Sequence, residues 1–438
     1  MSNVDCTRRA ILAGSAAGLA LSAGVVPATG RRGRAMPKGF LWGAATAGYQ
    51  VEGDSVNSDT WLFEHVKPNV FSEPSGSACD SYHRYEEDMD IAARIGLNCY
   101  RFSVEWSRIE PARGEFSQAQ LDHYERMVDA CRARGLAPVV TYSHFAVPRW
   151  FGANGGFESR ESIDLFARYC TRVTKAFGDR IALAATFNEP NLARQLQSIA
   201  GIRRARGALD AMLAAAAKAS GSDRFSSTVF GDPDRFDETM LAAHRHGYQA
   251  IKAVRGELPA GVTLAIADEQ GVGAGNRAAQ KRQELYDAWL KAAGESDFVG
   301  VQTYTRNLVG PNGDLEIPKG AEVTQAGYEF YPAALGNTIR YAAATSGKPV
   351  YVTENGVATA DDRRRIAYID GALAALRACI DEGVDVRGYI HWSLLDNFEW
   401  SSGYRPKFGL VAVDRTSFKR TVKPSALHLG GYAKANSI

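Results

Sequence analysis

The chain has 438 residues, of which 45% are hydrophobic and 10% aromatic, so it can bury a large core as one α/β barrel or as two medium-sized domains. Its 51 basic and 49 acidic residues leave a net charge of +2 and are spread along the chain. This balance excludes the electrostatic footprint of a nucleic-acid partner or an anionic membrane, and it favours a neutral small molecule as the partner.

The N-terminal residues differ in composition from the rest and resemble a twin-arginine export signal. Arg8 and Arg9 precede an apolar stretch rich in Ala, Gly and Leu that runs to Val26, and small residues suited to cleavage follow. The alternative is a membrane anchor, but Ile11 to Val26 spans only sixteen residues, whereas a membrane-spanning helix needs about 20. Residues 1–36 are therefore predicted to be a twin-arginine-type export signal and flexible N-terminus. The mature protein would be periplasmic, in the cell envelope or extracellular, without stable membrane insertion.

Short β-branched or aromatic runs alternate with longer amphipathic segments from residue 37 onward, as is typical of βα units around a parallel sheet. Eight strands are predicted, at Phe40–Ala44, Cys99–Phe102, Ala137–Tyr142, Leu183–Asn188, Thr263–Ala267, Phe298–Gln302, Val350–Thr353 and Gly388–Trp392. Seven helices are predicted between them, at Tyr85–Ile95, Leu121–Arg134, Ile163–Phe177, Glu238–Val254, Arg282–Ala293, Ala333–Ala344 and Arg363–Asp381. The expected fold class is α/β, a single (β/α)8 TIM barrel over residues 37–438 that no linker divides. The irregular residues 193–236 are predicted to be a helix and a long loop over the rim.

Polar residues fall at or just beyond the C-terminal ends of the predicted strands, and in a barrel these ends converge on one site. They are Gln50, Arg101, His144, Asn188, Glu189, Gln302, Tyr304, Glu354 and Trp392. Two of them, Glu189 in Thr186–Pro190 and Glu354 in Val352–Gly356, place a carboxyl group where a buried strand meets a loop. Cleavage of a glycosidic bond requires such a pair, because one carboxyl donates a proton to the leaving oxygen while the other stays ionised and attacks the anomeric carbon.

Five cysteines follow residue 36, and none has the CxxC or Cys/His spacing of a metal site. They are Cys79, Cys99, Cys131, Cys170 and Cys379. The odd number argues against a full disulfide framework, so buried free thiols are expected, with one disulfide left open. No cofactor and no metal are expected.

Several peptides together resemble glycoside hydrolase family 1, the β-glucosidase-type retaining enzymes, over about Pro37 to about Tyr432. The matching segments are 40–53, 100–108, 142–148, 186–190, 297–304, 352–356, 392–400, 403–404 and 408–410. Two positions depart from the family pattern. The first is Gln302-Thr303, which stands where the family usually has Asn-Tyr, and the second is Phe145, which stands where it usually has Trp.

The resemblance implies roles for five catalytic residues. Glu189 corresponds to the acid/base and Glu354 to the nucleophile, with carboxyl groups about 5–5.5 Å apart and retention of anomeric configuration through a covalent glycosyl-enzyme. Arg101 corresponds to the arginine that holds the nucleophile ionised. Asn188 corresponds to the residue that binds the sugar 2-hydroxyl, and Tyr304 to the tyrosine that points at the nucleophile.

The resemblance also implies how a neutral sugar is held, by aromatic stacking and polar contacts. Trp392 would stack beneath the sugar ring, and Glu399 would accept from hydroxyls 4 and 6 and repel a 6-phosphate. The implied substrate-binding residues are Gln50, His144, Asn188, Gln302, Trp392, Glu399, Trp400 and Phe408. The expected activity is hydrolysis of terminal, unphosphorylated β-linked sugars, on a small-molecule glycoside or an oligosaccharide.

Three alternatives stay open. A transglycosidase would use the same intermediate with an alcohol in place of water, and a non-catalytic glycan-binding barrel would keep the fold alone. A metal-dependent hydrolase could use His244 and His246, but these residues lie in a helical pattern in which positions i and i+2 diverge around the axis. The glycone, whether glucoside, galactoside or fucoside, and the oligomeric state are also left open.

Overall fold

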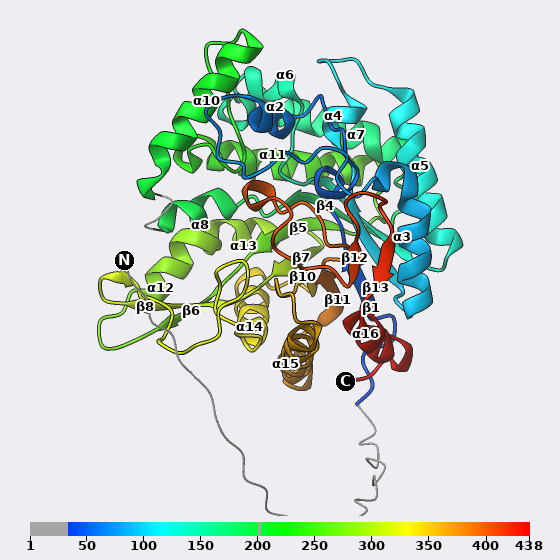
Figure 1. Ribbon diagram of the computed structural model, residues 1–438, viewed down its shortest axis with the longest axis vertical. Helices are drawn as coiled ribbons and strands as arrows, with labels where there is room; N and C mark the ends of the chain where they lie inside the picture. The colour runs from blue at the N-terminus through cyan, green and yellow to red at the C-terminus, as the bar shows by residue number, and fades with distance from the viewer. Residues whose placement is uncertain (1–33, 200–202) are drawn as a thin grey trace, which may run out of the picture. The chain divides into compact units, whose positions relative to one another are not determined.

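The computed structural model describes residues 34–199 and 203–438 (Figure 1). Of residues 1–36, predicted to be an export signal and flexible N-terminus, positions 1–33 lie outside the described residues, so the export signal stays a prediction. The folded unit begins at Ala35, which forms an antiparallel bridge with Ser437. Met36 follows and is buried, with 5% of its surface exposed. The compact unit runs from Ala35 to Ile438.

Eight parallel strands form a closed barrel in the order β1-β11-β10-β7-β5-β4-β3-β2, which confirms the predicted (β/α)8 fold. The strands are β1 Leu41–Ala45, β2 Cys99–Ser103, β3 Ala137–Ser143, β4 Leu183–Asn188, β5 Ala260–Ala265, β7 Phe298–Gln302, β10 Val350–Asn355 and β11 Val386–Trp392. The barrel closes because β1 pairs with β2 on one side and with β11 on the other. Figure 1 shows helices arranged around these strands.

The strands are apolar because both of their faces are buried. One face of the barrel wall contributes a cluster that includes Ala45, Cys99, Leu183, Phe298 and Ile390. The opposite faces join the larger core, which they share with the helices. A buried parallel strand thus has a short, nearly continuous apolar sequence. This pattern is why all eight strands could be found in the sequence.

The seven predicted helices are present. Six are continuous: α3 Ser81–Ile95, α5 Gln118–Ala133, α7 Ser162–Phe177, α11 Pro233–Val254, α14 Ala334–Ser346 and α15 Asp362–Asp381. Side-chain oxygens of Ser117, Asp232 and Asp361 cap the first turns of α5, α11 and α15. The seventh is divided into α12 Ala278–Arg282, the π-helical η2 Gln283–Asp287 and α13 Ala288–Ala293. The chain ends on α16 Pro424–Ala435, which the sequence pattern did not predict.

The loops that follow the strands carry short elements. The helical ones are α1 Gly48–Val51, α2 Asp59–His65, α4 Trp106–Ile109, α6 Arg149–Ala153, η1 Gly156–Glu158, α8 Leu192–Ser198, α10 Arg206–Ser220 and η3 Trp400–Ser402. The helix predicted within residues 193–236 corresponds to α10. Two small sheets were not predicted: β6 Asp268–Gly271 with β8 Arg306–Gly310 and β9 Gly313–Asp314, and the hairpin of β12 Val411–Val413 and β13 Arg420–Val422. These strands have two to five residues, too few to show an alternating pattern.

Two further expectations concern membranes and cysteines. Across residues 34–199 and 203–438, none of the helices combines the length and apolarity that crossing a bilayer would take. The five cysteines that follow residue 36 are all buried free thiols. Burial raises the pKa of Cys79 and of Cys131 to about 12, so these thiols stay protonated at neutral pH.

Candidate active site

The polar residues predicted at the strand ends lie together at the C-terminal mouth of the barrel. Arg101 comes from β2, Asn188 from the last position of β4, Gln302 from the last position of β7, Glu354 from β10 and Trp392 from the last position of β11. All five are buried. The parallel barrel brings these residues to one place although they are spread over nearly three hundred positions of the chain.

Arg101 is the centre of the hydrogen-bond network. Its side chain is fully buried, and its Nη1 donates to Glu354 Oε1 at 2.5 Å, while its Nη2 donates to Asn188 Oδ1 at 2.7 Å. Its Nε donates to Thr141 Oγ1 at 3.2 Å, and Nη1 also donates to the carbonyl of Thr353 at 3.1 Å. One guanidinium therefore fixes the carboxyl of Glu354 and the amide of Asn188 relative to each other.

The carboxyl of Glu354 is held at both oxygens. Arg101 donates to Oε1, and the hydroxyl of Tyr304 donates to Oε2 at 2.6 Å. Burial raises the pKa of Glu354 above its ordinary value, while Arg101 and the hydrogen bond from Tyr304 act in the opposite direction. Arg101 therefore lowers the pKa of Glu354, but burial raises this pKa by more than Arg101 lowers it.

Glu189 has a different environment. It directly follows β4, has a left-handed backbone with φ of 45°, and donates its backbone N–H to the carbonyl of Thr263 at 2.8 Å. Among the described residues, none donates a hydrogen bond to its carboxyl. Burial and the negative charge of Glu354 raise the pKa of Glu189 well above its ordinary value, with Arg101 acting against them. Of the two carboxyls, Glu189 is therefore the one that holds a proton.

The carboxyl group of Glu189 is close enough to that of Glu354 for the two charges to act on one another. Their predicted separation of about 5–5.5 Å stays a prediction. Two other residues beside the site, Phe145 and Trp400, also have positive φ, of 65° and 50°. Non-glycine residues rarely adopt this conformation, and it clusters at functional sites, where the surrounding structure enforces it.

Four buried polar atoms at the site have no partner among the described residues: Gln50 Oε1, His144 Nδ1, Asn188 Nδ2 and Gln302 Oε1. Gln50 is fixed because its Nε2 donates to Asn397 Oδ1 at 3.0 Å and to the carbonyl of Phe398 at 2.7 Å. Native proteins rarely leave buried polar groups unpaired. Four such atoms at one barrel mouth are what a polyhydroxylated ligand would satisfy.

Gln302, at the first departure from the family pattern, contacts Asn188. Its Nε2 donates to Asn188 Oδ1 at 3.0 Å, beside the hydrogen bond from Arg101 to the same oxygen. With Oδ1 occupied in this way, the amide Nδ2 of Asn188 is the group left for a ligand. Gln302 therefore orients Asn188.

Aromatic rings form a wall of the site. The ring of His144 stacks on Trp392 at 5.8 Å and on Trp400 at 6.4 Å between centroids. Burial and the charge of Arg101 lower the pKa of His144 well below its ordinary value, so the imidazole is neutral. Phe145, at the second departure, packs edge-on against Trp400 at 5.3 Å, and Phe408 packs edge-on against Tyr304 at 5.8 Å.

Glu399 lies beside Trp392, whose indole Nε1 donates to Glu399 Oε1 at 3.3 Å. Burial raises the pKa of Glu399 to about 8, and the negative charges of Glu354 and Asp396 contribute to the increase. Interactions with the side chains of Trp392 and Gln50 act against this increase. The carboxyl of Glu399 is thus mostly protonated at neutral pH in the ligand-free site, and the field around it is negative.

The sequence patterns missed Tyr328, which lies in the segment between β9 and α14. Its ring centroid is 6.4 Å from that of Tyr304, and 42% of its surface is exposed. Desolvation of its hydroxyl and the charges of Glu189 and Glu399 raise the pKa of Tyr328 to about 12. Tyr328 is thus a half-exposed aromatic residue beside Tyr304, within reach of the charges of Glu189 and Glu399. The only feature of the nearby sequence that could have drawn attention to Tyr328 is its position as an aromatic residue after Gly327 in an irregular segment.

The metal-site alternative does not agree with the geometry. His244 is buried, and its ring lies between the hydroxyls of Thr186, 2.8 Å from Nδ1, and Ser296, 3.2 Å from Nε2. His246, two positions along α11, is exposed. In the described part of the chain, no group of three or more His, Cys, Asp or Glu side chains is placed to hold a metal.

Comparison with known proteins points to one family. The model of the family described as glycosyl hydrolase family 1 matches residues 33–218 and 253–438. Beta-glucosidase A of Thermotoga maritima is 32% identical over 450 residues, which cover 92% of this chain and 98% of that protein. An apo structure of a beta-glucosidase has a TM-score of 0.89 and 49% identity, over 91% of this chain and 98% of that chain. The crystal structure of a beta-glycosidase has a TM-score of 0.87 and 49% identity, over 92% and 98%.

Proposed function

The chain belongs to glycosyl hydrolase family 1 and is a retaining β-glycosidase, and we propose that Glu354 is its nucleophile and Glu189 its acid/base. One observation carries the assignment. Glu354 is held by Arg101 and Tyr304, whereas Glu189 has no such partner among the described residues and has the more strongly raised pKa. Two carboxyls whose surroundings push their pKa values apart take opposite roles in proton transfer.

In the first step, a carboxylate oxygen of Glu354 forms a bond to the anomeric carbon as the bond to the leaving oxygen breaks. Glu189 gives its proton to that oxygen and becomes a carboxylate. In the second step, Glu189 takes a proton from water, the water oxygen bonds to the anomeric carbon, and the carboxylate of Glu354 departs. Two inversions at one carbon give net retention.

The unpaired buried atoms support a role in holding the sugar. Asn188 Nδ2, Gln50 Oε1 and His144 Nδ1 can bind sugar hydroxyls, since each is buried and lacks a described partner. Trp392 supplies an aromatic surface for the apolar face of a pyranose ring. Trp400 and Phe408 complete the aromatic wall, and the half-exposed Tyr328 lies where the aglycone would leave the pocket.

The sugar is proposed to be an unphosphorylated, glucose-like pyranose. The surroundings of Glu399 support this choice, because the charges that act on it most strongly, those of Glu354 and Asp396, are negative. A phosphate dianion placed beside Glu399 would meet the negative charges of Glu354 and Asp396, which act on the same position. The names of the relatives, beta-glucosidases, agree with the proposal.

The test is a panel of aryl β-glycosides on the mature protein, with the anomer of the released sugar followed by NMR. The β-glucoside is expected to be hydrolysed with the β-anomer appearing first. Its 6-phosphate should react at least about tenfold more slowly, because like charges in contact cost several kcal/mol. Appearance of the α-anomer first, or preference for the phosphate, would contradict the proposal. Added alcohols measure the share of transglycosylation in the same assay.

Export is also a proposal, supported by Arg8 and Arg9 ahead of a short apolar stretch. Expressed in a bacterium with the twin-arginine pathway, the full chain is expected in the periplasm with a new N-terminus before Ala35. Replacing both arginines by lysine should keep the protein in the cytoplasm. Equal export of this variant, or an exported protein that still begins at Met1, would rule the signal out.

A further inference from the structure

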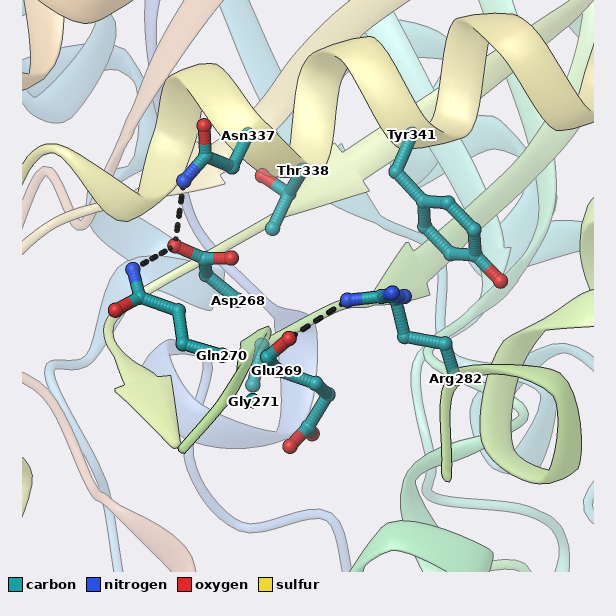
Figure 2. Close-up of a pocket in the computed structure, with 9 residues that line it drawn as sticks. Asp268, Glu269, Gln270, Gly271, Arg282, Asn337, Thr338 and Tyr341 are labelled. Atoms are coloured by element: carbon teal, nitrogen blue, oxygen red, sulfur yellow. Dashed lines mark hydrogen bonds between the residues drawn. The ribbon is translucent and has the colours of Figure 1, made fainter. Parts of the chain in front are cut away.

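A cavity separate from the catalytic residues lies beside the barrel: its lining includes none of the site residues, although Thr338 in the lining is hydrogen-bonded to Thr303, which lies between Gln302 and Tyr304. It has a volume of about 510 Å³ and lies between β6, the end of α12 and one face of α14 (Figure 2). Asp268, Arg282, Asn337 and Tyr341 are among the residues that line it, and none of these has a role in the glycosidase site described above. Its volume falls within the range of small-molecule sites in proteins.

Asp268 supplies an acceptor to this cavity. It is 7% exposed, and its Oδ2 accepts from Gln270 Nε2 at 2.6 Å and from Asn337 Nδ2 at 2.8 Å. These two hydrogen bonds fix the carboxyl, and no described residue donates to its other oxygen, Oδ1. Figure 2 shows that oxygen directed toward the space enclosed by the labelled side chains. The cavity therefore has a preoriented, open acceptor.

Arg282 supplies donors from another wall. Its Nη1 donates to the carbonyl of Glu269 at 2.7 Å, and its guanidinium carbon is 5.8 Å from the ring centroid of Tyr341. The remaining guanidinium N–H groups have no acceptor in the described part of the chain. Figure 2 shows the guanidinium between Tyr341 and β6. An open cationic donor and an aromatic ring thus share this side of the cavity.

The π-helical segment η2 holds these walls in place. Tyr286, within it, donates to Glu269 Oε1 at 2.8 Å, and Asp287 accepts from the hydroxyl of Tyr341. Lys281 pairs with Glu269 Oε2 at 2.9 Å, so the carboxyl of Glu269 is already neutralised. Single π turns are rare and frequently occur at functional sites. What remains open to a ligand is one carboxylate oxygen and one guanidinium.

We propose that this cavity is a second saccharide-binding site, separate from the catalytic pocket. An anion would be repelled by Asp268 and a cation by Arg282. A neutral sugar, in contrast, has hydroxyls that donate to the carboxylate and accept from the guanidinium. The ring of Tyr341 adds the aromatic contact that sugars use. The choice of a saccharide rests on the proposed function, since a glycosidase works where such ligands are abundant.

The test measures binding while the catalytic pocket is blocked. An iminosugar is added to the whole protein at the amount that just abolishes turnover, and D-glucose and an S-linked glucose disaccharide are then titrated by calorimetry. One saccharide per chain is expected to bind. Arg282→Gln and Asp268→Asn should each weaken this binding at least about tenfold, because each removes a hydrogen bond to a charged group. Arg363→Gln, the same change at an arginine whose side chain is 89% exposed, is the matched control.

All three variants are expected to hydrolyse an aryl β-glucoside within about twofold of the wild type. The proposal would be overturned if the titration gave no heat while the catalytic pocket is blocked, or if both cavity variants bound the saccharide as tightly as the wild type does. Binding of glycine instead of glucose would also overturn it. If a variant unfolds, a crystal of the wild-type protein soaked in the disaccharide decides the matter by density in the cavity. Failure of the wild type to hydrolyse any aryl glycoside would instead contradict the proposed function.

Discussion

Glu354→Ala is expected to reduce turnover by roughly 10⁴-fold or more, the scale seen when a residue of a covalent catalytic unit is removed. The reason is that no other described side chain at the site carries a carboxylate held by a cation, so the covalent intermediate cannot form. Initial rates on an aryl β-glucoside measure the loss. Glu382→Ala, at a carboxylate whose side chain is 51% exposed, is the matched control and should remain active.

Small anions should restore part of this activity. The substitution leaves Arg101 buried beside an empty space, where azide or formate can bind the guanidinium and attack the anomeric carbon. Only one inversion then occurs, so the product is a glycosyl azide or formate of inverted configuration, identified by NMR. Rescue with retained configuration would contradict the role of Glu354.

Loss of the buried ion pair also affects stability, since an uncompensated buried charge costs about 3–5 kcal/mol. The thermal unfolding midpoint of each variant therefore has to be measured beside its rate. Glu354→Gln keeps one oxygen that can accept from Arg101, and its amide N–H₂ can donate to the hydroxyl oxygen of Tyr304. This variant should therefore remain more stable than Glu354→Ala while being equally inactive as a nucleophile. Activity in a folded Glu354→Gln protein would refute the assignment.

Glu189→Ala is expected to slow hydrolysis by about 10²–10⁴-fold for glycosides with poor leaving groups, the usual contribution of a general acid. An activated aryl leaving group departs without protonation, so its glycosylation step should change much less. The slope of log kcat/KM against leaving-group pKa measures this difference. An equal effect on all leaving groups would mean that Glu189 does not donate the proton.

The same variant should change the pH profile of kcat/KM. Burial and the charge of Glu354 raise the pKa of Glu189, so in the wild type the acid form is lost, and activity falls, only as pH rises through that raised value. On the acid side, activity falls as Glu354 becomes protonated, above the ordinary glutamate value of about 4.3 because its pKa is also raised. Glu189→Ala should lose the alkaline decrease and keep the acidic one. Persistence of the alkaline decrease would assign it to another group.

Much of the fold could be predicted from the sequence because its signals are local. β4 and β7 have the bounds that the apolar runs predicted, residue for residue. Strands buried on both faces must be apolar, and helices packed on one side must be amphipathic, so neighbouring residues carry the information. The motif peptides around Glu189 and Glu354 are local in the same sense. The small sheets that contain β6 and β12 were missed because their strands are too short to show an alternating pattern, and β6 also pairs with β8 from a separate part of the chain.

What the sequence determined by itself was the order of the barrel strands and the position of each functional side chain at a strand end. Only the tertiary structure decided that Arg101 contacts Glu354, 253 positions away, that Gln302 orients Asn188, and that Tyr328 lies beside Tyr304. The raised pKa of Glu189 and the cavity beside α14 were likewise decided only by the tertiary structure. Coulomb forces, desolvation and cavities depend on distances through space, and these exist only after segments remote in the chain have packed together.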